Sequence, residues 1–263
     1  MEVHHHPHVA KKNFKEYFLE FLMIFLAVTL GFFAENIREH FVDKTHEQEY
    51  INSFYEDLSS DERELPDLIK SIEYQQLKTA DSLQALLPAT GSKTPANTVY
   101  TSLRKMIRQQ GIRIFVTDRT IEQIKNAGEM RLLTNKQISD SLVDYYKEVD
   151  FIEYLQRDLL AFKAELKEDF PRILKSQDYS KAIDAQDRII NPNENLYLSA
   201  TDPFTINKIL IEVSDIKGLS HTIQTMIAEL LGKAENIKKL ITVHYNIKNN
   251  DANNYSKPER MGN

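Results

Sequence analysis

The chain has 263 residues, and 33 Lys and Arg stand against 39 Asp and Glu, which gives a formal net charge of −6. This acidity argues against a nucleic-acid-binding protein held by phosphate contacts. The absence of Cys excludes disulfides, thiolate zinc sites, iron–sulfur clusters and a Cys nucleophile. Only 7 Gly and 8 Pro leave little turn chemistry for many short strands, so the composition predicts an all-α protein.

The chain begins with MEVHHHPHV, which holds a cluster of four imidazoles: His4, His5, His6 and His8. Neutral imidazoles could bind a transition metal. A flexible tail imposes no fixed coordination geometry, however, so these residues are only weak metal candidates. We interpret residues 1–16 as a His- and Lys-rich tail, and we expect no resident metal or cofactor.

Residues 17–34 form the most apolar stretch and contain one ionisable side chain, Glu20. As a helix this stretch is about 27 Å long, close to the ~30 Å hydrocarbon core of a bilayer. It is apolar on every face, and Tyr17 lies at the expected interface. We predict a single transmembrane helix, with a buried helix of a soluble protein as the alternative. Because three Lys precede the stretch, the N-terminus is expected in the cytoplasm.

One face of this predicted helix carries Glu20, Ala27, Gly31 and Ala34. Ala27 and Gly31 form a small-xxx-small pair, which lets two membrane helices approach closely. Glu20 has three possible roles. It could extend toward Lys12 or Lys15 at the interface, face a partner helix in an assembly, or line an ion pathway.

Two stretches resemble a family. The N-terminal MEVHHHPHV followed by KKNFKEYFLEFLMIFLAVTLGFFAENIREH is similar to an uncharacterised family of short membrane-anchored proteins from Bacteroidota. A second stretch, TIEQIKNAGEMRLLTNKQISDSLVDYY, resembles the helix, Gly, Leu-rich turn and helix segment of that family. The resemblance covers about a third of the chain. It implies a bacterial single-pass membrane protein and supplies no activity.

Amphipathic helices are predicted after the span. The first helix is expected to continue to about Ser59. Ile112–Val116 alternates in polarity, but a single strand cannot form a sheet, so we read it as an extended linker. The remaining segments before residue 130 are a helix over 62–87 with Pro66 near its first turn, a loop over 88–95, a helix over 96–110 ended by Gly111, and a helix over 119–127 ended by Gly128.

Two long helices follow. Thr134 and Gln137 have the spacing of a capping box for a helix that Pro171 stops. Its apolar register is interrupted by the polar Gln156 and Lys163. Asp202 and Pro203 are typical of the start of the last helix. That helix keeps a heptad pattern of Ile, Leu, Val and Ala for over 40 residues.

Long helices with one apolar stripe must bury it on each other. We therefore predict that residues 35–247 form an antiparallel helical bundle outside the cytoplasm, with residues 136–170 and 203–247 as its core pair. Residues 248–263 are expected to be disordered.

The sequence contains no P-loop, GxGxxG, GxSxG or HExxH motif. His221 and His244 are interpreted as half-buried bundle residues. Our main hypothesis is a non-enzymatic protein of the bacterial inner membrane with a periplasmic bundle. Its expected partners are the lipid bilayer and either copies of itself or a larger membrane complex. We expect it to bind no nucleic acid. The alternatives are a small-ligand sensor module that signals through another protein, and an oligomeric channel that uses Glu20.

Overall fold

A computed structural model describes residues 13–108, 112–245 and 247. Within these residues the chain is all-α, as the composition predicted, and no strand is formed apart from one isolated bridge between Ile183 and Ile189. The chain divides into two compact units, residues 1–49 and 50–263, which are described separately. The elements in chain order are α1 Phe14–Ile72, η1 Glu73–Leu77, α2 Lys78–Leu86, η2 Leu87–Ala89, α3 Asn97–Ile107, α4 Arg119–Ala127, η3 Met130–Leu132, α5 Lys136–Glu168, α6 Phe170–Ile173, α7 Ser176–Tyr179, η4 Ser180–Ala182 and α8 Pro203–Tyr245.

The first unit contains the N-terminal part of α1. One helix of the described chain is long and apolar enough to cross a membrane, and it is this one. None of its most apolar 18-residue window is buried. Large side chains such as Phe21, Leu30 and Phe33 are more than 60% exposed. A stretch this apolar, uncovered by protein, has the composition of a lipid-facing helix rather than of a core helix.

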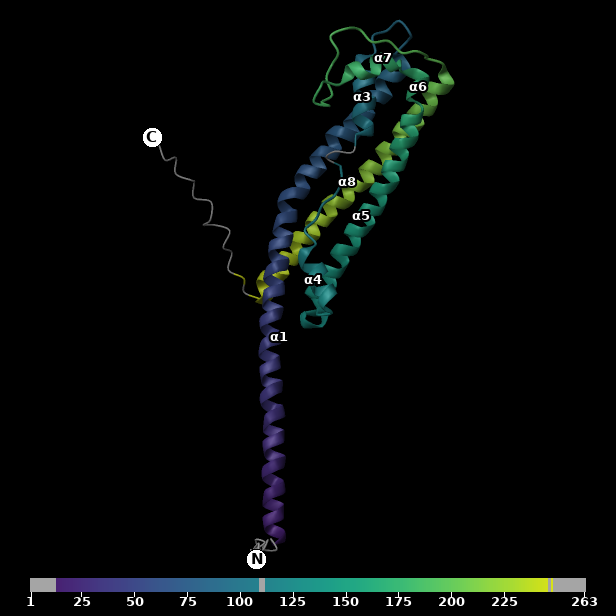
Figure 1. The fold of residues 1–263 in the computed structure, drawn as a ribbon. Coiled ribbons are helices and arrows are strands. Elements are labelled where there is room, and N and C mark those ends of the chain that lie inside the picture. The colour runs from purple at the N-terminus through teal and green to yellow at the C-terminus, as the bar shows by residue number, and fades with distance from the viewer. Residues whose placement is uncertain (1–12, 109–111, 246, 248–263) are drawn as a thin grey trace, which may run out of the picture. The chain divides into compact units, whose positions relative to one another are not determined.

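The second unit is built on an antiparallel pair, α5 and α8, which lie side by side in Figure 1. The direction follows from their ion pairs: Glu148 in the first half of α5 pairs with Lys233, and Asp169 just after the end of α5 pairs with Lys208. The heptad residues of α8 are buried as predicted: Ile206, Ile209, Val213, Ile216, Ser220, Ile223, Ile227, Leu230, Ala234, Ile237 and Ile241.

The end of α1, together with η1 and α2, forms the third long side of this bundle. Lys238 of α8 pairs with Glu62 at 2.7 Å, and Lys217 pairs with Asp81 at 2.5 Å. From Glu62 to Asp81 the residue numbers increase, while those of their partners on α8 decrease from Lys238 to Lys217. This side of the bundle is therefore also antiparallel to α8. The buried residues of α1 follow a heptad spacing: Ile51, Phe54, Leu58, Leu65 and Ile72.

Two of the predicted helix ends are wrong. α1 does not stop near Ser59 with a new helix at 62, because it continues to Ile72 with Pro66 inside it. The long helix α5 ends at Glu168, before Pro171, which instead lies in the first turn of the short α6. A Pro is tolerated in a first turn because its missing N–H is unbonded there.

The predicted cap of α5 is off by one residue. The N-cap is Asn135, whose side-chain oxygen accepts a hydrogen bond from Ile138 N at 3.1 Å, so Thr134 and Gln137 are not the capping pair. The prediction for α4 is confirmed, since it spans Arg119–Ala127 and ends at Gly128 with φ 68°. This left-handed conformation favours Gly.

Several other sequence predictions can also be placed. Residues 112–118 between α3 and α4 form neither a helix nor a strand, and we call them the extended linker. His221 and His244 are exposed rather than half-buried, because each points off the stripe of α8. Gly111, the four N-terminal His and residues 248–263 lie outside the described residues.

Candidate functional site

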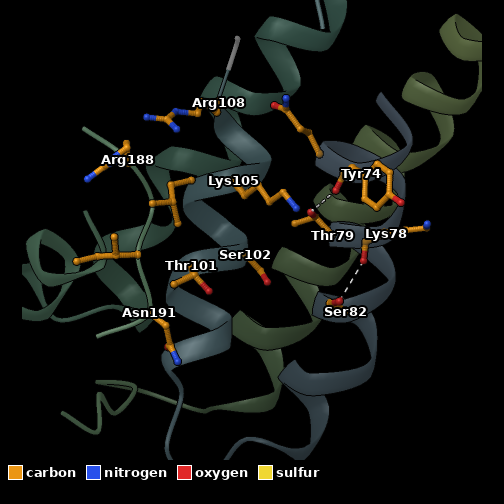
Figure 2. A pocket seen from close by; sticks show the side chains of 13 residues that line it. Tyr74, Lys78, Thr79, Ser82, Thr101, Ser102, Lys105, Arg108, Arg188 and Asn191 are labelled. Atoms are coloured by element: carbon orange, nitrogen blue, oxygen red, sulfur yellow. Dashed lines mark hydrogen bonds between the residues drawn. The ribbon is translucent and has the colours of Figure 1, made fainter. Parts of the chain in front are cut away.

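A pocket lies in the second unit, between α2 and α3. It has a volume of about 680 Å³, within the ~300–1,000 Å³ range of small-molecule sites. One wall is formed by η1 and α2, the opposite wall by α3, and the rim by the loop at residues 188–191 (Figure 2).

Helical spacing places the polar lining residues on facing surfaces. On α3, Thr101, Ser102, Lys105 and Arg108 follow one another at i, i+1, i+4 and i+7, so they share a face. The apolar residues of α3 point elsewhere and fill the core: Val99, Tyr100, Leu103 and Met106 are at most 1% exposed. On α2, a shorter stripe with the same spacing presents Lys78, Thr79 and Ser82 to the pocket.

The pocket is basic in a chain whose net charge is negative. Its lining includes Lys78, Lys105, Arg108 and Arg188, and no Asp or Glu. Arg108 is paired with Asp187 at 3.1 Å, and Arg188 is paired with Asp184 at 2.6 Å. These two ion pairs offset much of the charge of the arginines.

The two lysines differ from the arginines. The Lys78 ammonium lies over the Tyr74 ring, 4.2 Å from its centroid, and forms no ion pair with a described residue. Lys105 is half-buried, and its ammonium has neither an ion pair nor a hydrogen bond within the described part of the chain. Figure 2 shows Lys105 reaching from α3 toward Thr79 on α2. The Lys105 ammonium therefore faces the opposite wall of the pocket without a partner in the described chain, whereas Lys78 is exposed and extends away from Lys105 (Figure 2).

Hydroxyl groups complete the polar surface. Thr79 and Ser82 donate to the carbonyls of Tyr74 and Lys78 at 3.2 and 3.0 Å, and both hydroxyl oxygens retain acceptor capacity. Ser102 is only 7% exposed, lines the pocket, and has no hydrogen-bond partner for its hydroxyl among the described residues. A buried hydroxyl that faces a pocket is a suitable donor for a bound polar group.

A π-helical turn shapes one wall. η1 inserts one extra residue between α1 and α2, and Tyr74 and Gln75 of this turn line the pocket. Such turns occur frequently at functional sites. Gln76 in the same turn points into the core, where it is fully buried and neither amide atom has a hydrogen-bond partner among the described residues. The turn therefore leaves an unsatisfied polar group behind the pocket wall.

The rim loop has a constrained backbone. Asp187 adopts φ 57°, a left-handed conformation that is uncommon for residues other than Gly. The Asp184 carboxylate accepts hydrogen bonds from the backbone N–H groups of Gln186 and Arg188 at 3.0 and 2.8 Å, which lowers the pKa of Asp184. These contacts hold Arg188 at the rim.

The base of Arg108 is anchored from α5. Lys163, 3% exposed, donates from Nζ to the Arg108 carbonyl at 3.0 Å. Gln156 accepts from Ile114 N at 3.1 Å and donates to the Ile112 carbonyl at 2.7 Å. The two polar residues that interrupted the apolar register of α5 therefore satisfy the backbone at the end of α3 and in the extended linker.

Two carboxylates of α1 hold the other end of the extended linker and the start of α4. Asp61 accepts from Thr117 N at 2.8 Å and from the Tyr145 hydroxyl at 2.7 Å. Burial raises the pKa of Asp61, and these hydrogen bonds oppose that rise. Asp57 accepts from Thr120 N at 3.1 Å and pairs with Arg119 at 2.9 Å.

The pocket was not found from the sequence. Its one local signal was the hydroxyl and cation spacing on α3, which is also typical of any solvated helix face. Arg188 joins it across 80 residues of sequence. Among the described residues no group of three or more His, Asp and Glu is arranged to hold a metal ion.

The membrane-packing candidates lie in the first unit. Glu20, Ala27, Gly31 and Ala34 are all exposed on α1. A Cβ added at Gly31 would meet no atom within 4 Å, so the notch between Ala27 and Ala34 is open in a single copy of the chain.

Comparisons with family models, with characterised proteins and with solved structures found no match.

Proposed function

We propose that this chain is a membrane-anchored helical-bundle protein that acts by binding rather than by catalysis, as an assembly or accessory subunit. The observation that carries the proposal is the uncovered apolar surface of α1 before residue 43. Its large apolar side chains are exposed on every side of the helix. In water such a surface would drive aggregation, whereas in a bilayer it is the expected lipid contact.

The proposal includes a location. The resemblance of the N-terminus favours a bacterial inner membrane, and the Lys-rich leader favours a cytoplasmic N-terminus with residues 50–247 in the periplasm. Self-association through the small-residue face of the span is part of the same proposal.

Membrane extraction tests the anchor. The full chain is expected to remain in the membrane pellet after an alkaline carbonate wash. Replacing Leu26 and Val28 by Lys places two charges near the middle of the span, at about 2.5–3.5 kcal/mol each, and should release the chain. The control replaces Glu39 and His40 by Lys, outside the apolar stretch. A wild-type chain that washes off would contradict the anchor.

The absence of Cys makes topology directly measurable. Lys93→Cys, in the exposed loop between η2 and α3, should react with a membrane-impermeant maleimide in intact spheroplasts. Lys15→Cys, before the span, should react only after permeabilisation. The reverse labelling pattern would overturn the orientation.

A second candidate function, a small-ligand sensor that passes its signal to another protein, is favoured by the basic pocket between α2 and α3. Native mass spectrometry of the chain purified from its own membranes tests it. A bound small molecule is expected, and it should be lost in Lys105→Met. A wild-type chain that carries no bound small molecule would contradict this candidate.

A further inference from the structure

We propose that the pocket between α2 and α3 binds a small monocarboxylate with an apolar body, whose carboxylate lies between the Lys105 ammonium and the Ser102 hydroxyl. This inference rests on the second candidate function, the small-ligand sensor, and names its ligand class. It is independent of the membrane anchor, since every residue used belongs to the second unit.

The two donors extend from one face of α3. Figure 2 shows Ser102 and Lys105 both directed from α3 toward α2. They are three residues apart, so they lie one turn apart with their Cβ atoms about 5–6 Å from each other. A helical side chain leans toward the N-terminus of its helix, which directs the Lys105 stem over the turn that carries Ser102. The ammonium and the hydroxyl can therefore reach the two oxygens of one carboxylate.

Neither donor has a partner in the part of the chain that the structure describes. Ser102 is only 7% exposed although it lines the pocket, and Lys105 is half-buried. A polar group that is removed from water and left unbonded destabilises the folded chain, so a ligand that accepts from it gains affinity. A carboxylate is an acceptor at both oxygens, and it matches an ammonium and a hydroxyl donor.

The charge balance selects a ligand with one negative charge. Both arginines of the lining already form ion pairs with aspartates. Lys78 is exposed, lies over the Tyr74 ring and extends away from Lys105 (Figure 2). Among the described lining residues this leaves Lys105 as the unpaired cation that faces the opposite wall. A monoanion neutralises it, whereas a dianion would bring a second charge that no converging group offsets.

The lining also disfavours a positive group on the ligand. No Asp or Glu lines the pocket. The α-ammonium of an amino acid would therefore lose water without a carboxylate to pair with. The ligand is accordingly an acid without an amino group.

The remaining walls favour an apolar body. A volume of about 680 Å³ is far larger than a carboxylate group fills. Tyr74, Ile189 and Ile190 also line the pocket, and Tyr74 and Ile190 are 59% and 39% exposed. Covering these side chains removes apolar surface from water, which favours an aliphatic or aromatic body over a polar one.

Calorimetric titration tests the proposal with 3-phenylpropanoate as the probe. The full chain in phosphatidylcholine nanodiscs is expected to bind it at one site, with empty nanodiscs as the blank. Lys105→Met should weaken binding about tenfold or more, and Ser102→Ala about threefold, as expected for a charged and a neutral hydrogen bond. Lys105→Arg keeps the charge and should retain most of the affinity. The matched control is Lys78→Met, which removes a lysine of the same pocket and should leave binding unchanged.

Three analogues of the probe test the ligand class. The neutral 3-phenylpropanamide, the zwitterion phenylalanine and the dianion benzylmalonate should each bind more weakly than 3-phenylpropanoate. Equal binding of the amide would overturn the role of the carboxylate. Equal losses in Lys78→Met and Lys105→Met would show a general attraction for anions and would overturn the site.

A carboxylate can come from a soluble acid or from a fatty acid of the membrane. Nanodiscs that contain oleate distinguish these sources. Unchanged binding of 3-phenylpropanoate in them supports a soluble acid, and competition by oleate assigns the carboxylate to a membrane fatty acid.

Failure of this inference is distinguishable from failure of the proposed function. A wild-type chain that does not bind 3-phenylpropanoate would overturn the assignment to a monocarboxylate and leave the membrane anchor standing. A small molecule that co-purifies but contains no carboxylate would retain the sensor candidate and reject its ligand class. Thermal unfolding of each variant shows whether a loss of binding reflects the site or the fold.

Discussion

Lys163 is a cation in a helix interface, where it is 3% exposed and its ammonium donates to a single backbone carbonyl. Removal from water disfavours the charged form, and burial lowers the pKa of this amine to about 7. The group therefore changes charge near neutral pH, at the point where α3 ends beside the pocket.

The pH dependence of stability follows from this shift. Below pH 7 the amine is protonated in both the folded and the unfolded chain, so the cost of burying its charge is fully present. Above pH 7 the folded chain releases the proton, whereas unfolded Lys keeps it until about pH 10.4. The free energy of unfolding should therefore rise with pH between 7 and 9, with a slope that approaches about 1.4 kcal/mol per pH unit.

Lys163→Met should remove this contribution. Met fills a similar volume without a charge, so the rise between pH 7 and 9 should be absent from its urea-unfolding curves. Lys167→Met, one turn later on the exposed face of α5, should keep the slope of the wild type. Equal slopes in wild type and Lys163→Met would show that Lys163 does not titrate in this range.

At the scale of elements, the extended linker shows how buried polar groups can fix a segment without regular structure. It crosses between α1 and α5 with alternating orientation: Ile112 and Ile114 are buried, and Phe115 is 66% exposed. Its backbone cannot form a ladder, because no second strand accompanies it in the described chain. Side chains of α1 and α5 instead bond four of its backbone groups: the N–H groups of Ile114 and Thr117 and the carbonyls of Ile112 and Thr117.

The Asp61 anchor can be tested by a double-mutant cycle. In Asp61→Asn one carboxylate oxygen becomes an NH₂, which must face either Thr117 N–H or the Tyr145 hydroxyl. This should destabilise the bundle by about 2–3 kcal/mol. Adding Tyr145→Phe removes one of the facing donors, so the double variant should lose less than the sum of the single losses.

Urea unfolding of the four proteins measures the coupling, and Asp140→Asn on the exposed face of α5 is the control. Strict additivity would show that Asp61 and Tyr145 do not interact in the folded chain. A loss in Asp140→Asn as large as that in Asp61→Asn would mean that the effect is one of charge alone.

The sequence predicted those elements whose signals are local or periodic. The heptad of α8 and the Gly128 stop of α4 are of this kind, and the structure confirms both. The predicted boundary in α1 just before Pro66 was wrong, because Pro66 lies inside the helix. A single Pro can be accommodated where tertiary packing holds the turns before and after it. The predicted end of α5 was wrong because the helix breaks at Asp169, which closes α5 and precedes α6.

The pocket could not be predicted for a different reason. Its residues come from η1, α2, α3 and a loop 80 residues further along the chain, and no sequence period links them. The polar interruptions at Gln156 and Lys163 were visible in the sequence. Their role depended on knowing that a non-helical segment lies against them.

At the scale of the whole molecule, the proposed self-association of the apolar N-terminal helix is open to direct test. The space beside Gly31 is empty to at least 4 Å from where a Cβ would lie, so a larger residue there does not disturb one isolated chain. If two copies meet at this face, a bulky side chain must separate them.

Gly31→Ile should therefore reduce dimerisation in lipid vesicles at least tenfold, measured by energy transfer between donor- and acceptor-labelled chains. Thr29→Ile introduces the same residue on the opposite helix face and should leave dimerisation unchanged. Equal effects of the two substitutions would argue against the small-residue interface, and unaltered energy transfer in Gly31→Ile would exclude it.

The ion pair between Glu62 and Lys238 also has a consequence for the order in which the chain is made. The two partners are 176 residues apart, and the buried stripe of α8 is the surface on which both α1 and α5 close. During synthesis the apolar faces of residues 51–72 and 138–166 emerge long before their cover does. Folding of the bundle must therefore wait for the last helix, and the nascent chain needs protection from aggregation throughout that interval.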